Sequence, residues 1–137
     1  MRVNQPVTQK EVTYPKSYNL LSVTSTSSHI KYASKAFCEV AGYSLDEMVG
    51  APHNMVRHPD MPPEAFRDMW DHLNAGKSCM GIVKNRCSNG DHYWVDAFAS
   101  PIQENGQVVE YQSVRLCPDR KHVDNAEKVY EQIRNGK

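Results

Sequence analysis

The segment Arg57-His58-Pro59-Asp60 places two hydrogen-bond donors and one acceptor within four residues. The planar guanidinium of Arg57 is suited to phosphate oxygens, and the ring of His58 adds a second donor. The carboxylate of Asp60 could accept a hydrogen bond from a ribose hydroxyl or hold Arg57 in position. These residue types are therefore candidates for binding the polar part of a phosphate-bearing ligand.

Each of these side chains also has a structural interpretation. Arg57 could form an ion pair within the protein. Asp60 could cap a helix that begins nearby, but the N–H groups that such a cap would bind belong to two consecutive prolines, which have none. His53 and His58 could be metal ligands, but no third ligand lies at a recognised spacing, so we expect no metal site.

Asn85 is a further candidate because it lies within a predicted strand, where asparagine is disfavoured. It could face a cavity, where its amide would hydrogen-bond a ligand, or lie on an exposed face of the sheet. Phe66 and Trp70 belong to the apolar stripe of a predicted helix, and they could pack that helix on the layer beneath or contact a ligand. The following strand has two possible inner faces, one with Tyr93, Val95 and Ala97 and one with Trp94, Asp96 and Phe98.

The elements that would position these residues follow a simple order. Strands are predicted over residues 18–25, 29–33, 80–87, 91–102 and 107–116. Helical segments are predicted over residues 35–41, 44–50 and 64–75, with a final helix opened by Pro118 and Asp119. A proline-rich irregular loop, residues 51–63, precedes the longer helix. This order predicts an α+β domain with a five-stranded antiparallel sheet, short helices on one face and a cavity between the layers.

The composition narrows the possible functions. The 137 residues carry 16 basic and 16 acidic side chains, a balance that argues against a nucleic-acid-binding platform. No apolar run approaches the roughly 20 residues of a membrane span, and the first 15 residues lack the apolar region of a signal peptide. We therefore expect no membrane insertion by this segment. The absence of hydrolase, P-loop and paired-carboxylate motifs leads us to expect no enzyme.

Two longer stretches carry a family resemblance. Residues 52–62 read PHNMVRHPDMP, and residues 81–95 read GIVKNRCSNGDHYWV. Both stretches are similar to the signature segments of the PAS domain in bacterial aerotaxis receptors, and the similarity extends over nearly the whole chain. The resemblance implies the PAS fold, with an N-terminal arm over residues 1–17, a core over 18–117 and a C-terminal helix over 118–137 that leads to the rest of a receptor.

The resemblance also implies a cofactor. PAS domains of this family hold FAD non-covalently and report its redox state. The residues implied for the cofactor are Arg57, His58 and Asp60 for its pyrophosphate and ribose, Asn85 for the polar edge of the flavin ring, and the neighbouring aromatics Phe66 and Trp70.

The same resemblance implies partners and a location. The domain would signal in aerotaxis to a chemotaxis kinase, through the HAMP and signalling segments of the same receptor. It would form a homodimer and lie in the cytoplasm, at the inner face of the bacterial inner membrane.

Two residues depart from the family pattern and keep other functions open. Many relatives have tryptophan where this chain has Cys79, and asparagine where it has Ser34. Loss of a ring-stacking contact costs roughly 0.5–1.5 kcal/mol. The alternatives are a cofactor-free or small-ligand PAS interaction module of a chemoreceptor and a haem gas sensor with His58 or His72 as the axial ligand.

Overall fold

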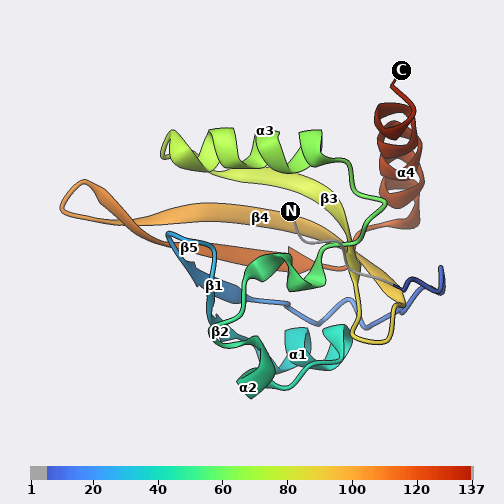
Figure 1. Ribbon diagram of the computed structural model, residues 1–137, viewed down its shortest axis with the longest axis horizontal. Helices are drawn as coiled ribbons and strands as arrows, with labels where there is room; N and C mark the ends of the chain where they lie inside the picture. Colours follow the sequence, from blue (N-terminus) through green and yellow to red (C-terminus); the bar gives the residue numbers. More distant parts are fainter. Residues whose placement is uncertain (1–5, 137) are drawn as a thin grey trace.

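The sheet in the computed structural model, which describes residues 6–136, has five antiparallel strands in the order β2-β1-β5-β4-β3 (Figure 1). The strands are β1 (Ser22–Ser25), β2 (Ile30–Ala33), β3 (Cys79–Arg86), β4 (His92–Glu104) and β5 (Gln107–Leu116). The last strand in the chain, β5, therefore lies in the centre of the sheet, and β3 forms an edge. The predicted five-stranded antiparallel sheet is confirmed.

Short helices cover one face of the sheet, as predicted. They are α1 (Lys35–Ala41), α2 (Leu45–Met48), the 3₁₀ helix η1 (His53–Val56) and α3 (Pro63–Asn74), and α4 (Arg120–Arg134) follows the last strand. In Figure 1, α3 runs beside β3 at one edge of the sheet, whereas α1 and α2 lie at the opposite edge near β2. Sheet and helices together form the predicted α+β arrangement.

Polar side chains set the boundaries of the first two helices. Ser34 accepts a hydrogen bond from the backbone N–H of Phe37, and Gly42 ends α1 with a φ of 79°, a left-handed conformation that glycine adopts without strain. Ser44 and Glu47 form the predicted capping box of α2. These local signals explain why both helices begin where the sequence predicts.

The structure departs from the predicted elements in three places. β1 begins at Ser22 rather than at residue 18, because the backbone N–H of Tyr18 closes a turn instead of joining the sheet. Residues 53–56 of the predicted irregular loop form η1. The predicted apolar stripe of the final helix is only partly buried, since Val123 is buried but Val129 is 51% exposed.

Apolar side chains gather in two clusters on the inner face of the sheet. The larger cluster includes Phe37 of α1 and Met48 of α2, and the smaller one includes Leu73 of α3 and Tyr111 of β5. Both clusters contribute side chains to a cavity between the sheet and α3. Among residues 6–136, no helix combines the length and the apolar character that crossing a bilayer requires.

Both chain ends pack against the β3–β4 hairpin. In the arm, the backbone N–H of Val12 donates to the carbonyl of His92, and the N–H of His92 donates to the carbonyl of Lys10. In α4, the hydroxyl of Tyr130 donates to the carbonyl of Ile82 in the edge strand β3. Residues 1–5 of the predicted arm, and residue 137 at the other end, lie outside the described residues.

Candidate ligand-binding cavity

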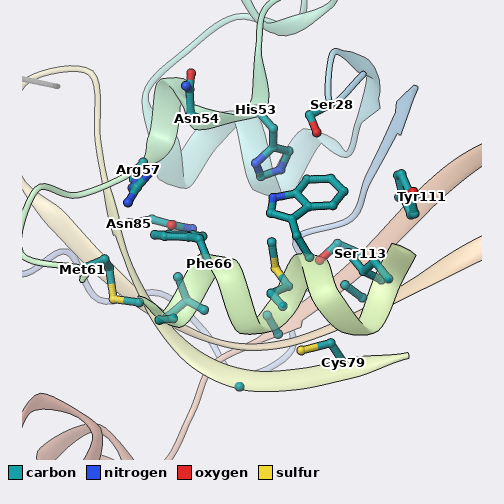
Figure 2. A pocket seen from close by; sticks show the side chains of 18 of the residues that line it. Ser28, His53, Asn54, Arg57, Met61, Phe66, Cys79, Asn85, Tyr111 and Ser113 are labelled. Atoms are coloured by element: carbon teal, nitrogen blue, oxygen red, sulfur yellow. The ribbon is translucent and has the colours of Figure 1, made fainter. Parts of the chain in front are cut away.

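A cavity of about 680 Å³ lies between the inner face of the sheet and the helices α3 and η1 (Figure 2). Known ligand pockets measure roughly 300–1,000 Å³. The space between the two layers is therefore not filled by the protein's own side chains, and it has the size of a cofactor site.

The two broad walls of the cavity are apolar and differ in shape. The wall formed by α3 carries larger side chains, namely Phe66, Met69, Trp70 and Leu73. The wall formed by the sheet carries smaller ones, namely Val83, Val95, Ala97 and Ala99. Trp70 stands edge-on to Tyr111, with the ring centroids 5.3 Å apart. A flat apolar group could therefore lie between aromatic side chains on one side and small aliphatic side chains on the other.

The cavity identifies the inner face of β4, which the sequence pattern left open. Val95 and Ala97 line the cavity, and Tyr93 on the same face is fully buried in the larger apolar cluster. The opposite face carries Trp94 and Phe98 and points away from the cavity.

Arg57 and Asn85 lie next to Phe66 at one end of the cavity (Figure 2). Asn85 is 4% exposed, so it does not lie on an exposed face of the sheet. Its backbone forms an isolated bridge with Arg57, whose guanidinium carbon lies 4.2 Å from the centre of the Phe66 ring. Burial lowers the pKa of Arg57, although a guanidinium remains charged at neutral pH. This end of the cavity combines a cation, an amide and an aromatic ring.

His58 and Asp60 do not line the cavity, although they follow Arg57 closely in sequence. The ring of His58 is fully buried and stands edge-on to His92, and its Nδ1 accepts a hydrogen bond of 3.0 Å from the backbone N–H of Asp60. The carboxylate of Asp60 accepts a bond of 2.9 Å from the ammonium group of Lys84. Since Lys84 and Asn85 are adjacent on β3 and face opposite sides, the chain passes around the edge of β3 between residues 57 and 60. Direct contacts of His58 and Asp60 with a cofactor stay predictions.

The structure also bears on the alternative roles of these residues. The interpretation of Asp60 as a helix cap is wrong, because the cap position of α3 is Pro62 and no described side chain bonds the N–H groups there. Neither His58 nor His72 lines the cavity, so neither is placed to bind a haem iron inside it. Within residues 6–136, no three potential ligands lie close enough together to hold a metal ion.

Arg115 of β5 is a cavity-lining cation that the sequence patterns did not single out. Its side chain is 5% exposed and makes three hydrogen bonds. One terminal nitrogen donates to the carbonyl of Leu20 at 3.1 Å and to the hydroxyl of Ser22 at 3.0 Å, and the other donates to Nε2 of His53 at 2.7 Å. The guanidinium carbon lies 4.7 Å from the centre of the Phe37 ring. Arg115 is therefore held rigidly at the wall.

The partners of Arg115 are all uncharged. No carboxylate of the described chain forms an ion pair with it. Burial, reinforced by the charge of Arg115, lowers the pKa of His53 to about 3, so that ring is neutral. Burial lowers the pKa of Arg115 to about 10, so the guanidinium stays charged near neutral pH. Because an uncompensated buried charge is costly, this wall favours a ligand with an anionic or hydrogen-bond-accepting group.

One signal in the sequence could have indicated this cation. Tyr111, Ser113 and Arg115 share one face of a strand, because side chains alternate. A charged residue on the inner face of a central strand requires polar partners. Only the strand order reveals that β5 is central and that this face is the inner one.

Comparison with known proteins finds relatives over most of the chain. A family model described as the PAS fold matches residues 30–115. An aerotaxis receptor of Escherichia coli (strain K12) is 44% identical over 131 residues, which are 96% of this chain and 26% of that receptor. A nitrogen fixation regulatory protein of Klebsiella pneumoniae is 28% identical over 92 residues, which are 66% of this chain and 19% of that protein. The chain thus spans about a quarter of the first relative's length and about a fifth of the second's.

Solved structures share the architecture. A light-oxygen-voltage domain studied with a flavin analogue gives a TM-score of 0.71 at 23% identity, covering 87% of this chain and 89% of that chain. The dark structure of the blue-light photoreceptor Aureochrome1 LOV gives a TM-score of 0.70 at 22% identity, with coverage of 85% and 84%. At these identities the likeness concerns the fold alone.

Proposed function

This chain belongs to the PAS fold family, and we propose that it is the sensor domain of an aerotaxis receptor and holds FAD in the cavity between the sheet and α3. The 44% identity to the aerotaxis receptor of E. coli supports the sensory role. The observation that supports a bound cofactor is the buried charge of Arg115. This residue lies on the wall of an apolar slot and has no carboxylate partner among the described residues.

The slot has the shape and the polar groups that a flavin ring requires. An isoalloxazine ring is planar and mostly apolar, and it carries carbonyl and N–H groups along one edge. Trp70 on one wall and Val95 on the other could cover its two faces. Arg115 and Asn85 could donate hydrogen bonds to its carbonyl oxygens, and the charge of Arg115 would favour the electron density that the polar edge gains on reduction.

The resemblance to aerotaxis receptors is the reason for proposing FAD rather than FMN, and Arg57 is the cation that could bind the phosphates of FAD. FAD has a pyrophosphate between the flavin and the adenosine, so its tail needs a cation or other hydrogen-bond donors. Arg57 lies at the end of the cavity beside Phe66, where its guanidinium could bind two phosphate oxygens. His58 and Asp60 would support this contact from the far side of β3.

Asn85 is proposed to convert the redox state of the cofactor into movement. When bound, the flavin supplies a reversible reduction that changes protonation along its polar edge. A side-chain amide can present either an acceptor oxygen or donor N–H groups, so Asn85 would turn when that edge changes and pull on β3. Output then requires that the oxidised and reduced states favour two arrangements of the domain unequally.

The receptor context completes the proposal. The domain would lie in the cytoplasm at the inner face of the inner membrane and would form a homodimer. It would signal through the HAMP and signalling segments of its own receptor to a chemotaxis kinase. The outer face of the sheet is the proposed contact surface, because it leaves Phe98 and Leu116 exposed, and exposed apolar patches on soluble domains mark interaction sites.

The absorption spectrum of the purified protein tests this proposal. We expect the two visible bands of an oxidised flavin, and chromatography of the released cofactor should identify FAD. Release of FMN alone would contradict the assignment of FAD. A sample that stays colourless after FAD is added would instead support the cofactor-free interaction module, and a Soret band would support a haem sensor.

A further inference from the structure

A second, polar pocket lies on the outer side of β3, where the arm, the segment 57–61 and α4 meet. Its volume is about 300 Å³, and its lining includes Gln9, Asp60, Lys84, Trp94 and Arg134. These residues come from the arm, the loop before α3, the strands β3 and β4, and α4. The pocket therefore marks a junction between the core and both chain ends.

Lys84 is the centre of this junction. Its side chain is 8% exposed, and lysine is rarely buried without a partner. The ammonium group donates to the carboxylate of Asp60 at 2.9 Å and to the side-chain oxygen of Gln9 at 3.2 Å. It also lies 5.9 Å from the centre of the Trp94 ring. Lys84 thus contacts the loop and the arm at once.

Asp60 makes further hydrogen bonds at this junction. Its carboxylate accepts from the amide of Gln9 at 3.4 Å, and its backbone carbonyl accepts from the guanidinium of Arg134 at 2.6 Å. Burial alone would raise the pKa of Asp60, but hydrogen bonding and attraction to the Lys84 ammonium outweigh that effect and lower it. The carboxylate is therefore ionised at neutral pH and paired with an internal cation.

The segment 57–61 holds β3 from two sides. At the free edge of β3, the backbone of Arg57 forms a bridge with Asn85, and the Arg57 side chain lines the cavity. On the outer side, Asp60 is paired with Lys84, the residue that precedes Asn85 on the strand. Two adjacent residues of β3, Lys84 and Asn85, are therefore bound by the two ends of the segment 57–61.

We propose that the segment 57–61 is a clip over the edge of β3, closed by the Asp60–Lys84 pair, that joins the cavity wall to both chain ends. Asp60 is then a positioning residue, which acts on the cavity through Lys84 and the loop and does not touch the ligand. Opening the clip frees the loop that carries Arg57, and it lets the Asp60 carboxylate move away from Gln9 and the Asp60 carbonyl move away from Arg134. The inference rests on the proposed function only for the identity of the ligand.

Hydrogen exchange of the cofactor-free protein tests the clip. Asp60→Asn, Lys84→Gln and the double variant should each speed exchange at the amides of Thr8 and Val12 and along α4. The expected increase is roughly tenfold, since the pair is partly buried. The increase in the double variant should be smaller than the sum of the two single increases, because each single variant already breaks the pair and leaves one charge unpaired.

Two further variants serve as controls. Lys16→Gln removes a second lysine–aspartate pair, Lys16–Asp119 at 2.9 Å, which links the arm to the start of α4. Both side chains of this pair are largely exposed. Its exchange should match that of the wild type, because exposed pairs contribute little. Lys84→Arg keeps the charge and should restore exchange to within about twofold of the wild type. Increases that add up in the double variant, or an unchanged arm in Lys84→Gln, would overturn the clip.

Retention of added FAD separates positioning from direct contact. If Asp60 acts through Lys84, then Asp60→Asn and Lys84→Gln both lower FAD affinity, and the double variant lowers it by less than the product of the two factors. If Asp60 touches the cofactor, Lys84→Gln leaves the affinity unchanged, and the positioning role is wrong. A wild-type protein that takes up no FAD contradicts the proposed function, while the exchange measurements still decide the clip.

Discussion

Two buried cations lie on opposite sides of the same sheet, and among the described residues only one of them has a carboxylate partner. Lys84, on the outer side of β3, is paired with Asp60 at 2.9 Å. Arg115, on the inner side of β5, is bonded to a carbonyl, a hydroxyl and the neutral ring of His53. Both side chains are almost completely removed from water.

The difference separates a structural site from a binding site. A buried charge that is already paired needs no further partner, and removal of its partner destabilises the fold. A buried charge with only neutral partners carries a desolvation cost that an incoming anionic or accepting group would reduce. Mutation of the junction on the outer side is therefore expected to lower stability directly and ligand affinity only through the loop. Mutation of the cavity is expected to lower ligand affinity directly.

Acid should weaken both regions, because each contains a buried neutral histidine, His53 in the cavity and His58 beside the Asp60–Lys84 pair. Burial lowers the pKa of His53 to about 3 and of His58 to about 4, against an ordinary value of 6.5. A lowered histidine pKa means that stability is complete above pH 6.5 and is lost as the pH falls toward the folded-state values. Each histidine should lower the free energy of unfolding by about 3 kcal/mol between pH 6.5 and pH 4.

Urea unfolding of the cofactor-free protein from pH 7 to pH 4 measures this loss. His53→Gln and His58→Gln should each reduce the pH dependence by about one proton. Variants whose pH dependence equals that of the wild type would show that these rings titrate normally.

Replacing Arg115 should affect binding far more than folding. In Arg115→Met we expect FAD affinity to fall about 100-fold, since hydrogen bonds to charged groups contribute roughly 1.5–3 kcal/mol each. The unfolding free energy without cofactor should change by less than about 1 kcal/mol, because removal of the buried charge offsets the lost hydrogen bonds. Arg115→Lys keeps the charge and loses the forked guanidinium, so its FAD affinity should lie between those of the wild type and Arg115→Met. A large loss of stability with unchanged affinity would make Arg115 a structural residue like Lys84.

Asn85 lies between the two regions, so its replacement tests whether they communicate. Asn85→Ala should leave the fold largely intact and lower FAD affinity by about tenfold or less, the equivalent of one neutral hydrogen bond. It should also abolish any difference in hydrogen exchange of the arm between the oxidised and reduced protein. Equal protection of the arm in both redox states of the wild type would count against this role.

Replacement of Cys79 should have the smallest effect on FAD affinity, and it should raise that affinity. Its side chain lines the cavity at the start of β3. Cys79→Trp should tighten FAD binding by roughly 0.5–1.5 kcal/mol through ring stacking, measured by fluorescence titration. Cys79→Ser, which adds no ring, should stay within about twofold of the wild type. Weaker binding in the tryptophan variant would mean that the slot has no room for another ring.

The sequence by itself determined the elements and the fold class of this protein. Ser34 and Ser44 cap helices within three residues of themselves, and Asn105 and Gly106 take the positive φ values, 53° and 79°, that a tight hairpin needs. Such signals act between residues that are close in the chain, so composition and spacing reveal them. Asn85 was identified in the same way, by its unusual setting within a strand, whereas Arg57 was identified by its residue type and by the family resemblance.

Only the tertiary structure decided which of the candidate residues face the cavity. Arg57 and Asp60 are three residues apart, yet the loop that carries them turns around the edge of β3 and leaves them on opposite sides. His53 and Arg115 are 62 positions apart, and they meet because β5 lies in the centre of the sheet. Contacts between distant residues depend on strand order and register, and the periodicity of a single strand contains neither.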